Sequence, residues 1–97
     1  MNPATALYDF MDMIWEDPRI GPSHISLFMA ILVVLRNQEY KLPISAFSKE
    51  LMKIAKISSK ETYHKRIQEL REFGYIVYNP SFNSNLKSLI FLNSKFL

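Results

Sequence analysis

The stretch "SSKETYHKRIQELREFGYI", residues 58–76, decides the fold that we expect for this chain. Its apolar residues recur at the spacing of one helix face, and the other positions are mostly polar or charged. The members of that face are Tyr63, Ile67 and Leu70. Ser58 and Glu61 fit a capping box at the start of a helix, and Gly74 fits the residue just beyond its end. The stretch therefore predicts an amphipathic helix over residues 58–73.

A β-hairpin is predicted directly after this helix. The segments "YIVYN" (75–79) and "SLIFLN" (88–93) are rich in β-branched and aromatic residues, which favour strands. Between them, "PSFNSNLK" (80–87) has the composition of a turn. We therefore expect two antiparallel strands joined by a rather long loop.

Two helices are expected in the N-terminal part of the chain. The segment "ATALYDFMDMIWE" (4–16) spaces its apolar residues like a helix, and Pro18 should end that helix at about residue 17. Pro22 fits the start of the next helix, which stays apolar on every side through Leu35. A helix that is apolar all round lies at the centre of a core.

A third helix should run from about Ser45 to Ala55, just before the opening stretch. The segment "KLPI" (41–44) ahead of it fits a connector or a brief edge strand, and Lys56 with Ile57 fits a very short turn after it. Two helices joined in this way make a helix-turn-helix, whose second helix enters the major groove of DNA. The sequence thus predicts an α+β, mostly helical fold, a winged helix-turn-helix with an extra N-terminal helix and a C-terminal β-hairpin wing.

Residues 51–81, "LMKIAKISSKETYHKRIQELREFGYIVYNPS", resemble the core of bacterial winged-helix DNA-binding domains. The positions that match the pattern are Leu51, Ala55, Ile57, Ser58, Thr62, Tyr63, Ile67, Leu70, Gly74, Tyr75 and Ile76. More narrowly, "PSHISLF", "TYHKRIQEL", "FGYI" and "NPSFN" are similar to a group of small winged-helix proteins of bacterial chromosomes and mobile elements. The chain departs from the pattern at Lys56, where many such turns have glycine, and in its wing, which lacks glycine.

The resemblance implies one winged-helix domain over residues 1–97, with its core in residues 22–92 and the helix of residues 4–17 outside that core. A chain of 97 residues is long enough for one small domain. The absence of cysteine excludes disulfides and thiolate metal sites and fits an intracellular setting. The longest apolar run, Leu27 to Leu35, is too short to span a membrane, and no export signal is recognisable, so we expect a cytoplasmic protein without a membrane partner.

The charges are distributed unevenly along the chain. The net charge is +3, but residues 1–40 carry five acids against two arginines, and residues 41–97 carry ten lysines or arginines against four acids. The basic part contains the predicted helix-turn-helix. Such asymmetry suggests a surface that meets a polyanion.

The predicted contact region for double-stranded DNA is centred on the start of the fourth helix, because the first turns of a recognition helix usually point into the groove. Lysine and arginine suit guanine edges and phosphates, and hydroxyl groups bind either bases or phosphate. The expected contacts are Ser59, Lys60, Thr62, His64, Lys65, Arg66 and Gln68 on that helix, Lys53 and Lys56 before it, and Asn85 and Lys87 in the wing.

Several of these residues also have a structural interpretation. His64 fits an ordinary solvated side chain, and Glu61 with Lys65, like Glu69 with Arg66, fits a helix-stabilising pair. The polar wing residues 83–85 fit a loop that is simply exposed to water. His24 is better explained as part of a helix start beside Ser23 than as a ligand, so no metal site is predicted.

The N-terminal helix carries a broad apolar surface made by Leu7, Phe10, Met11, Ile14 and Trp15. A helix outside a trihelical core has to bury such a surface somewhere. It either forms a homodimer contact or packs on its own domain against residues 27–35, and the sequence does not separate the two.

The expected function is sequence-specific DNA binding as a small transcriptional regulator, or as an accessory protein of replication or of a mobile element. The alternative is a winged-helix module whose fourth helix and wing bind a protein instead of DNA, since the fold serves both functions. We predict no enzymatic activity, cofactor or small-molecule ligand, because no nucleophile and base pair, phosphate-binding glycine loop or metal-ligand spacing is present.

Overall fold

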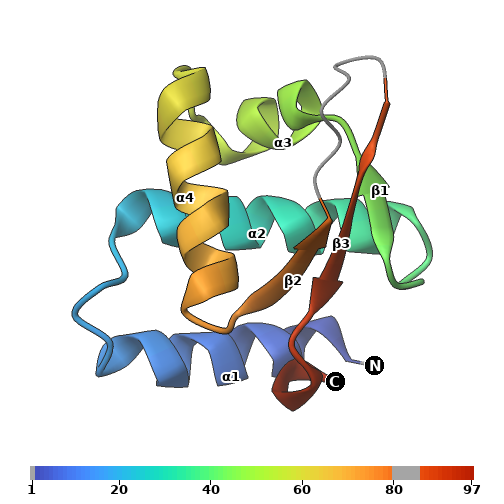
Figure 1. The fold of residues 1–97 in the computed structure, drawn as a ribbon. Helices are drawn as coiled ribbons and strands as arrows, with labels where there is room; N and C mark the ends of the chain where they lie inside the picture. The colour runs from blue at the N-terminus through green and yellow to red at the C-terminus, as the bar shows by residue number, and fades with distance from the viewer. Residues whose placement is uncertain (1, 80–85) are drawn as a thin grey trace.

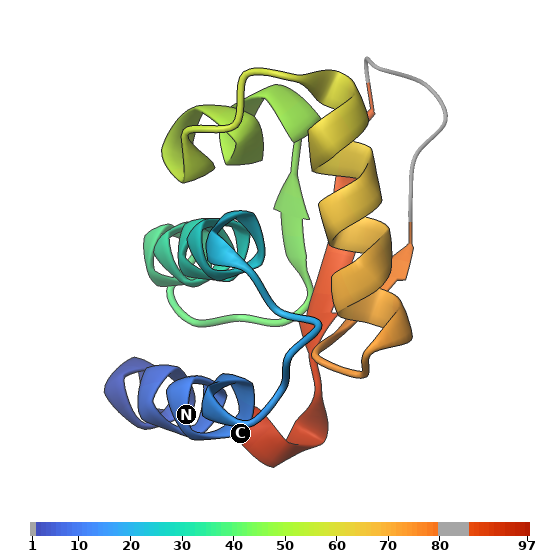
Figure 2. The same cartoon turned by 90° about the vertical axis from the view of Figure 1, so that its left-hand side faces the viewer.

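The computed structural model describes residues 2–79 and 86–97, which form an α+β fold of four α-helices, three antiparallel strands and a final 3-10 turn (Figure 1). The elements are α1 (Pro3–Trp15), α2 (Pro22–Asn37), β1 (Ile44–Ala46), α3 (Ser48–Ala55), α4 (Lys60–Glu72), β2 (Ile76–Asn79), β3 (Ser88–Leu92) and η1 (Ser94–Phe96). In the side view, α1, α2 and α3 form a stack, and α4 and the sheet lie beside it (Figure 2).

Helix α2 is the centre of the core, as its all-round apolar sequence predicted. Leu27, Ile31 and Leu35 have no exposed surface, and α2 contacts α1, α3, α4 and β1. Pro22 occupies the first turn of α2, where its missing N–H costs nothing. None of the helices in residues 2–79 and 86–97 has the length and apolar character needed to cross a membrane.

The inner face of α1 packs on its own domain. Phe10 is fully buried, and its ring stacks on that of Phe28 in α2 with 3.8 Å between the centroids. Phe96 of η1 contacts both rings edge-on. The expectation of a dimer contact at Phe10 is therefore wrong for this side chain, because the domain itself takes it up.

The sheet has the strand order β1-β3-β2, and the hairpin predicted from the sequence supplies β2 and β3. Ile44 of β1 and Tyr78 of β2 both lie opposite Ile90 of β3, and all three side chains are buried. Residues 44–46 thus belong to an edge strand, and α3 begins at Ser48. The predicted start of the third helix at Ser45 was wrong.

The outer edge of β1 is covered by a side chain of the loop after α2. The amide group of Gln38 donates to the Ser45 carbonyl at 2.7 Å and accepts from the Ser45 N–H at 3.1 Å. Both backbone groups of Ser45 therefore have a partner, although no strand of the described residues lies beyond β1 in the sheet.

The turn between α3 and α4 is fixed by two backbone features and one buried residue. Lys56 adopts a left-handed conformation with φ of 62°, and the N–H of Ile57 bonds to the carbonyl of Met52 at 3.0 Å. Ile57 is 8% exposed and anchors the turn in the core. Ser59 caps α4, because its hydroxyl accepts from the Thr62 N–H at 3.2 Å. The capping box predicted for Ser58 and Glu61 was therefore one residue out of register.

The other end of α4 confirms the role predicted for Gly74. This residue has φ of +86°, which L side chains rarely adopt. Its N–H bonds to the Arg71 carbonyl at 3.1 Å, and that of Tyr75 bonds to the Leu70 carbonyl at 2.9 Å. These two bonds make a Schellman motif, which ends α4 and directs the chain into β2.

Candidate functional site

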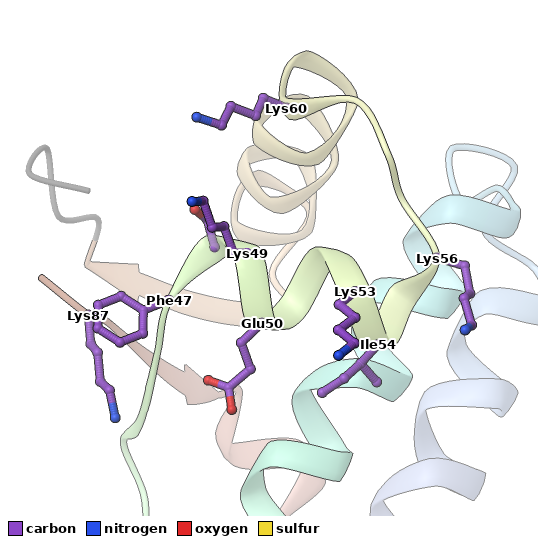
Figure 3. Close-up of a pocket in the computed structure, with 9 residues that line it drawn as sticks. Phe47, Lys49, Glu50, Lys53, Ile54, Lys56, Lys60 and Lys87 are labelled. Carbon is purple, nitrogen blue, oxygen red and sulfur yellow. The ribbon is translucent and has the colours of Figure 1, made fainter. Parts of the chain in front are cut away.

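An open groove lies along α3, the start of α4 and the residue that leads into β3 (Figure 3). It is lined by Phe47, Ser48, Lys49, Glu50, Lys53, Ile54, Lys56, Lys60 and Lys87. Five lysines thus face one glutamate. The groove has a volume of about 1170 Å³ and is open to solvent along its length.

Helix α3 aims two of these lysines outward because its opposite face is buried. Leu51 is fully buried and Ala55 is 3% exposed, and both face the core. Lys49 and Lys53 are one helical turn apart and exposed, so their ammonium groups share the outer face. Lys56 extends the same row beyond the helix end, from its left-handed position.

Lys60 enters the groove from α4. It is the first residue of that helix, directly after the cap Ser59, and it is exposed. The buried turn at Ile57 brings the start of α4 next to α3. Figure 3 shows the Lys60 side chain extending over the groove on the same side as Lys49.

Lys87 closes the groove on the side of the sheet. Its ammonium group lies 5.4 Å from the centroid of the Phe47 ring, a cation–π contact between the residue before β3 and the residue before α3. Phe47 is 36% exposed, so its ring forms part of the groove surface. The pair places a positive charge and an apolar face side by side at this end.

The lysines of the groove have no compensating partners nearby. None of the five forms an ion pair with any residue in the described ranges, whereas Arg19, Lys41 and Arg66 are each paired with an acid. Glu50 is the single acid among the lining residues. The groove is therefore a concentrated positive surface on a chain whose net charge is only +3.

The structure brings together four of the predicted DNA contacts, Lys53, Lys56, Lys60 and Lys87. It adds Lys49, which sequence reasoning missed. The signal was present, because lysines occupy positions 49, 53, 56 and 60, which repeat at the spacing of one helix face across the turn. The prediction for the third helix rested on its apolar residues, so Lys49 was not considered as a contact.

Apart from Lys60, the predicted contacts on α4 and at its cap lie outside the lining of the groove. His64 and Lys65 are exposed, Thr62 and Gln68 are half-buried, and Ser59 serves as the helix cap. Asn85 falls outside the described residues, so its predicted contact stays a prediction. Lys65 has no ion-pair partner among the described side chains, which leaves its predicted pairing with Glu61 unformed.

Arg66, a predicted DNA contact, forms an ion pair within the protein. Its guanidinium group donates to Glu69, which also receives a hydrogen bond from His24 at 3.1 Å. The Gly21 N–H donates to Nδ1 of His24 at 2.9 Å, so the other ring nitrogen carries the proton that bonds to Glu69. This confirms His24 as part of a helix start and Arg66 as part of a structural pair.

Glu69 stays ionised in this arrangement. Partial burial raises the pKa of its carboxyl group, but the hydrogen bonds from His24 and Arg66 lower it by more, and the pKa is lowered overall. The three side chains join the start of α2 to the middle of α4. They fix the orientation of the helix whose first residue lines the groove.

A second exposed surface lies at the opposite end of the molecule, on α1 (Figure 1). Trp15 is 87% exposed, and Tyr8 and Met11 lie beside it on the outer side of the helix. A shallow apolar groove between α1 and α2 includes Leu7 and Met29. Leu7 and Ile14 are half-buried, so they contribute less to the surface than the sequence suggested.

Comparisons with known proteins give no further guide to this site. A scan against protein-family models and searches among curated proteins and solved structures found no match to the chain.

Proposed function

We propose that this protein is a winged-helix protein that binds double-stranded DNA, acting as a small transcriptional regulator or as an accessory protein of replication or of a mobile element. The observation that carries the proposal is the groove of five lysines against one glutamate at the junction of α3, α4 and β3. Phosphate contacts by lysine supply most of the affinity in non-specific DNA binding and fix the position of the protein on the duplex.

The arrangement of elements supports the same proposal. Helix α3, a short turn and α4 follow one another as in a helix-turn-helix, and the hairpin of β2 and β3 follows α4 directly. In that arrangement, the first turns of α4 approach base edges, and the hairpin loop contacts the backbone or the minor groove. Lys60, Thr62 and His64 are the candidates for contacts from α4, and Asn85 and Lys87 those from the wing.

The measurement that tests the proposal is a fluorescence titration of the full chain with a random DNA duplex at several salt concentrations. If four or five lysines each neutralise a phosphate, log K should fall with log salt at a slope of about −4. Lys60→Ala should reduce that slope by about 0.9, because one contact is lost.

The matched control is Lys95→Ala, which removes an exposed lysine from η1, away from the groove. It should leave the slope unchanged. Absence of duplex binding by the wild-type protein even at low salt would contradict the proposal.

The exposed side chains of α1 favour a second candidate function, a module that binds another protein. Trp15, Tyr8 and Met11 form an exposed apolar surface, and tryptophan and tyrosine are common anchors of protein interfaces. If the titration detects no DNA binding, protein binding becomes the favoured function. Both functions are compatible in one chain, because the lysine groove and the outer face of α1 are at opposite ends of the molecule (Figure 1).

A further inference from the structure

We infer that DNA docks across the end of the molecule, with the phosphates of one strand over α3, and that the outer face of α4 stays out of contact. The inference rests on the proposed function and specifies the surface that serves it. It makes Lys49 a phosphate contact and Glu50 the acid that opposes binding. A recognition helix laid lengthwise in the major groove would use the outer face of α4 instead.

The dimensions of α3 suit a short run of backbone. A helix of eight residues is about 12 Å long, and one DNA strand carries a phosphate per ~3.4 Å of axis, so α3 lying parallel to that axis spans about three phosphates. Lys49 and Lys53 occupy the exposed side of α3, and Lys56 continues their row. Lys60 and Lys87 flank this row from α4 and from the sheet side (Figure 3).

The outer face of α4 has the wrong charge for a phosphate backbone. The side opposite the buried residues Tyr63 and Ile67 carries Glu61 and Glu72, with Lys65 as its cation. Two carboxylates against one ammonium group give this face no positive excess. A duplex lying along it would meet repulsion that the groove over α3 avoids.

The fold gathers the elements that carry the groove at one end of the molecule. In Figure 1, α3, the start of α4 and the start of β3 gather at one end of the molecule, and α1 and both termini lie at the other. The lysines of the groove come from all three elements at that end or from the residues beside them. A duplex across this end therefore lies over the elements from which all five lysines come.

Two glutamates provide a matched pair of probes. Glu50 lies in the first turn of α3 and Glu61 in the first turn of α4. Both are exposed, and neither has an ion-pair partner in the part of the chain that the structure describes. Exchange for glutamine keeps the shape of each side chain and removes one charge, so the two variants disturb folding to a similar degree.

The experiment compares the duplex affinities of Glu50→Gln and Glu61→Gln at 0.15 M salt, where charges separated by more than about 8 Å are largely screened. Glu50→Gln should bind about fivefold more tightly, because a carboxylate that faces the phosphates is removed. Glu61→Gln should change the affinity less than about twofold. Circular dichroism confirms that both variants are folded.

The salt dependence of alanine variants supplies an independent measurement. Lys49→Ala and Lys53→Ala should each reduce the slope of log K against log salt by about 0.9, and Lys65→Ala should leave it unchanged. The opposite pattern, with tighter binding by Glu61→Gln and a reduced slope for Lys65→Ala, overturns end-on docking while the proposed DNA binding stands. If the wild-type protein shows no duplex binding, both proposals are overturned.

Discussion

At the scale of single residues, the hydrogen bond between Tyr75 and Asp17 joins two distant parts of the chain. The Tyr75 hydroxyl donates to the Asp17 carboxylate at 2.7 Å, and Arg19 binds both oxygens of the same carboxylate. The Arg19 guanidinium group also lies over the Phe73 ring. The loop between α1 and α2 is thereby tied to the end of α4 and the start of β2.

These contacts shift the pKa values of both acidic groups. Hydrogen bonds from Arg19 and Tyr75 hold the pKa of Asp17 well below its usual range. Burial and the hydrogen bond to Asp17 raise the pKa of Tyr75 to about 12. Asp17 therefore stabilises the fold above its unfolded pKa of about 3.9, and this contribution is lost as pH falls through the lowered native value.

We expect Tyr75→Phe to lower the free energy of unfolding by about 1.5 kcal/mol at pH 7, the usual contribution of a hydrogen bond to a charged group. The difference from wild type should persist at pH 3, where the native Asp17 carboxylate is still ionised, because its pKa is held well below the usual range. Urea denaturation followed by circular dichroism at pH 7 and pH 3 measures it. Tyr8→Phe alters an exposed tyrosine and should have no effect. Loss of the Tyr75→Phe difference already at pH 3 would contradict the assignment.

The sequence predicted the ends of α4 to within two residues because few residue types serve there. Gly74 was identified correctly, since a positive φ at a helix end favours glycine strongly. Either Ser58 or Ser59 has the hydroxyl needed for a cap, and only the geometry of the turn selects Ser59. The left-handed conformation of Lys56 was not predictable, because lysine has no preference for it.

At the scale of elements, α1 shows what an apolar pattern leaves undecided. The apolar residues of α1 cover more than one face of the helix. In the fold, Ala6 and Phe10 are buried, whereas Met11 and Trp15 are exposed. The division depends on where α2 and η1 lie, and these contacts are long-range. A helical pattern alone contains no information on them.

Phe10→Ala should lower the free energy of unfolding by about 3–5 kcal/mol, because it leaves a large cavity beside Phe28. Trp15→Ala should change it by less than about 0.5 kcal/mol, since that side chain is 87% exposed. Chemical denaturation monitored by far-UV circular dichroism compares the two variants. Equal effects would show that the outer face of α1 is also buried in solution.

The sequence allowed a brief edge strand at residues 41–44, but it assigned residues 45 and 46 of β1 to the third helix. Ser45, Ala46 and Phe47 continue the helical spacing of the residues that follow, and three residues are too few for a strand pattern. The strand exists because β3, more than forty residues further along, pairs with it. Non-local pairing of this kind escapes a local reading of sequence.

At the scale of the whole molecule, the fold gathers five lysines from the basic part of the chain into one groove. The basic half was evident from composition, and four of the five lysines of the groove were predicted as contacts. What the sequence could not show was their convergence, since Lys87 reaches the groove only through the pairing of the strands. Nor could it show that Arg66 is occupied by Glu69.

Self-association through the outer face of α1 is proposed as a function of this surface that leaves the lysine groove free, because the two lie at opposite ends of the molecule. Light scattering should then report a dimer for the wild-type protein and a monomer for Trp15→Asp, which places a charge in the apolar contact. Leu89→Glu alters an exposed position on β3 instead and should remain dimeric. A wild-type monomer at all concentrations tested would rule out this arrangement.

The contact of Gln38 with Ser45 opposes aggregation of the protein at high concentration. A free strand edge offers unpaired amides on which another polypeptide can grow a continuous ladder, the route to domain swapping and fibrils. Here the side chain of Gln38 occupies both backbone groups of Ser45 and imitates a neighbouring strand. Beyond β1, a second polypeptide would have to displace this amide before it could add to the sheet, so the contact acts as a guard against aggregation.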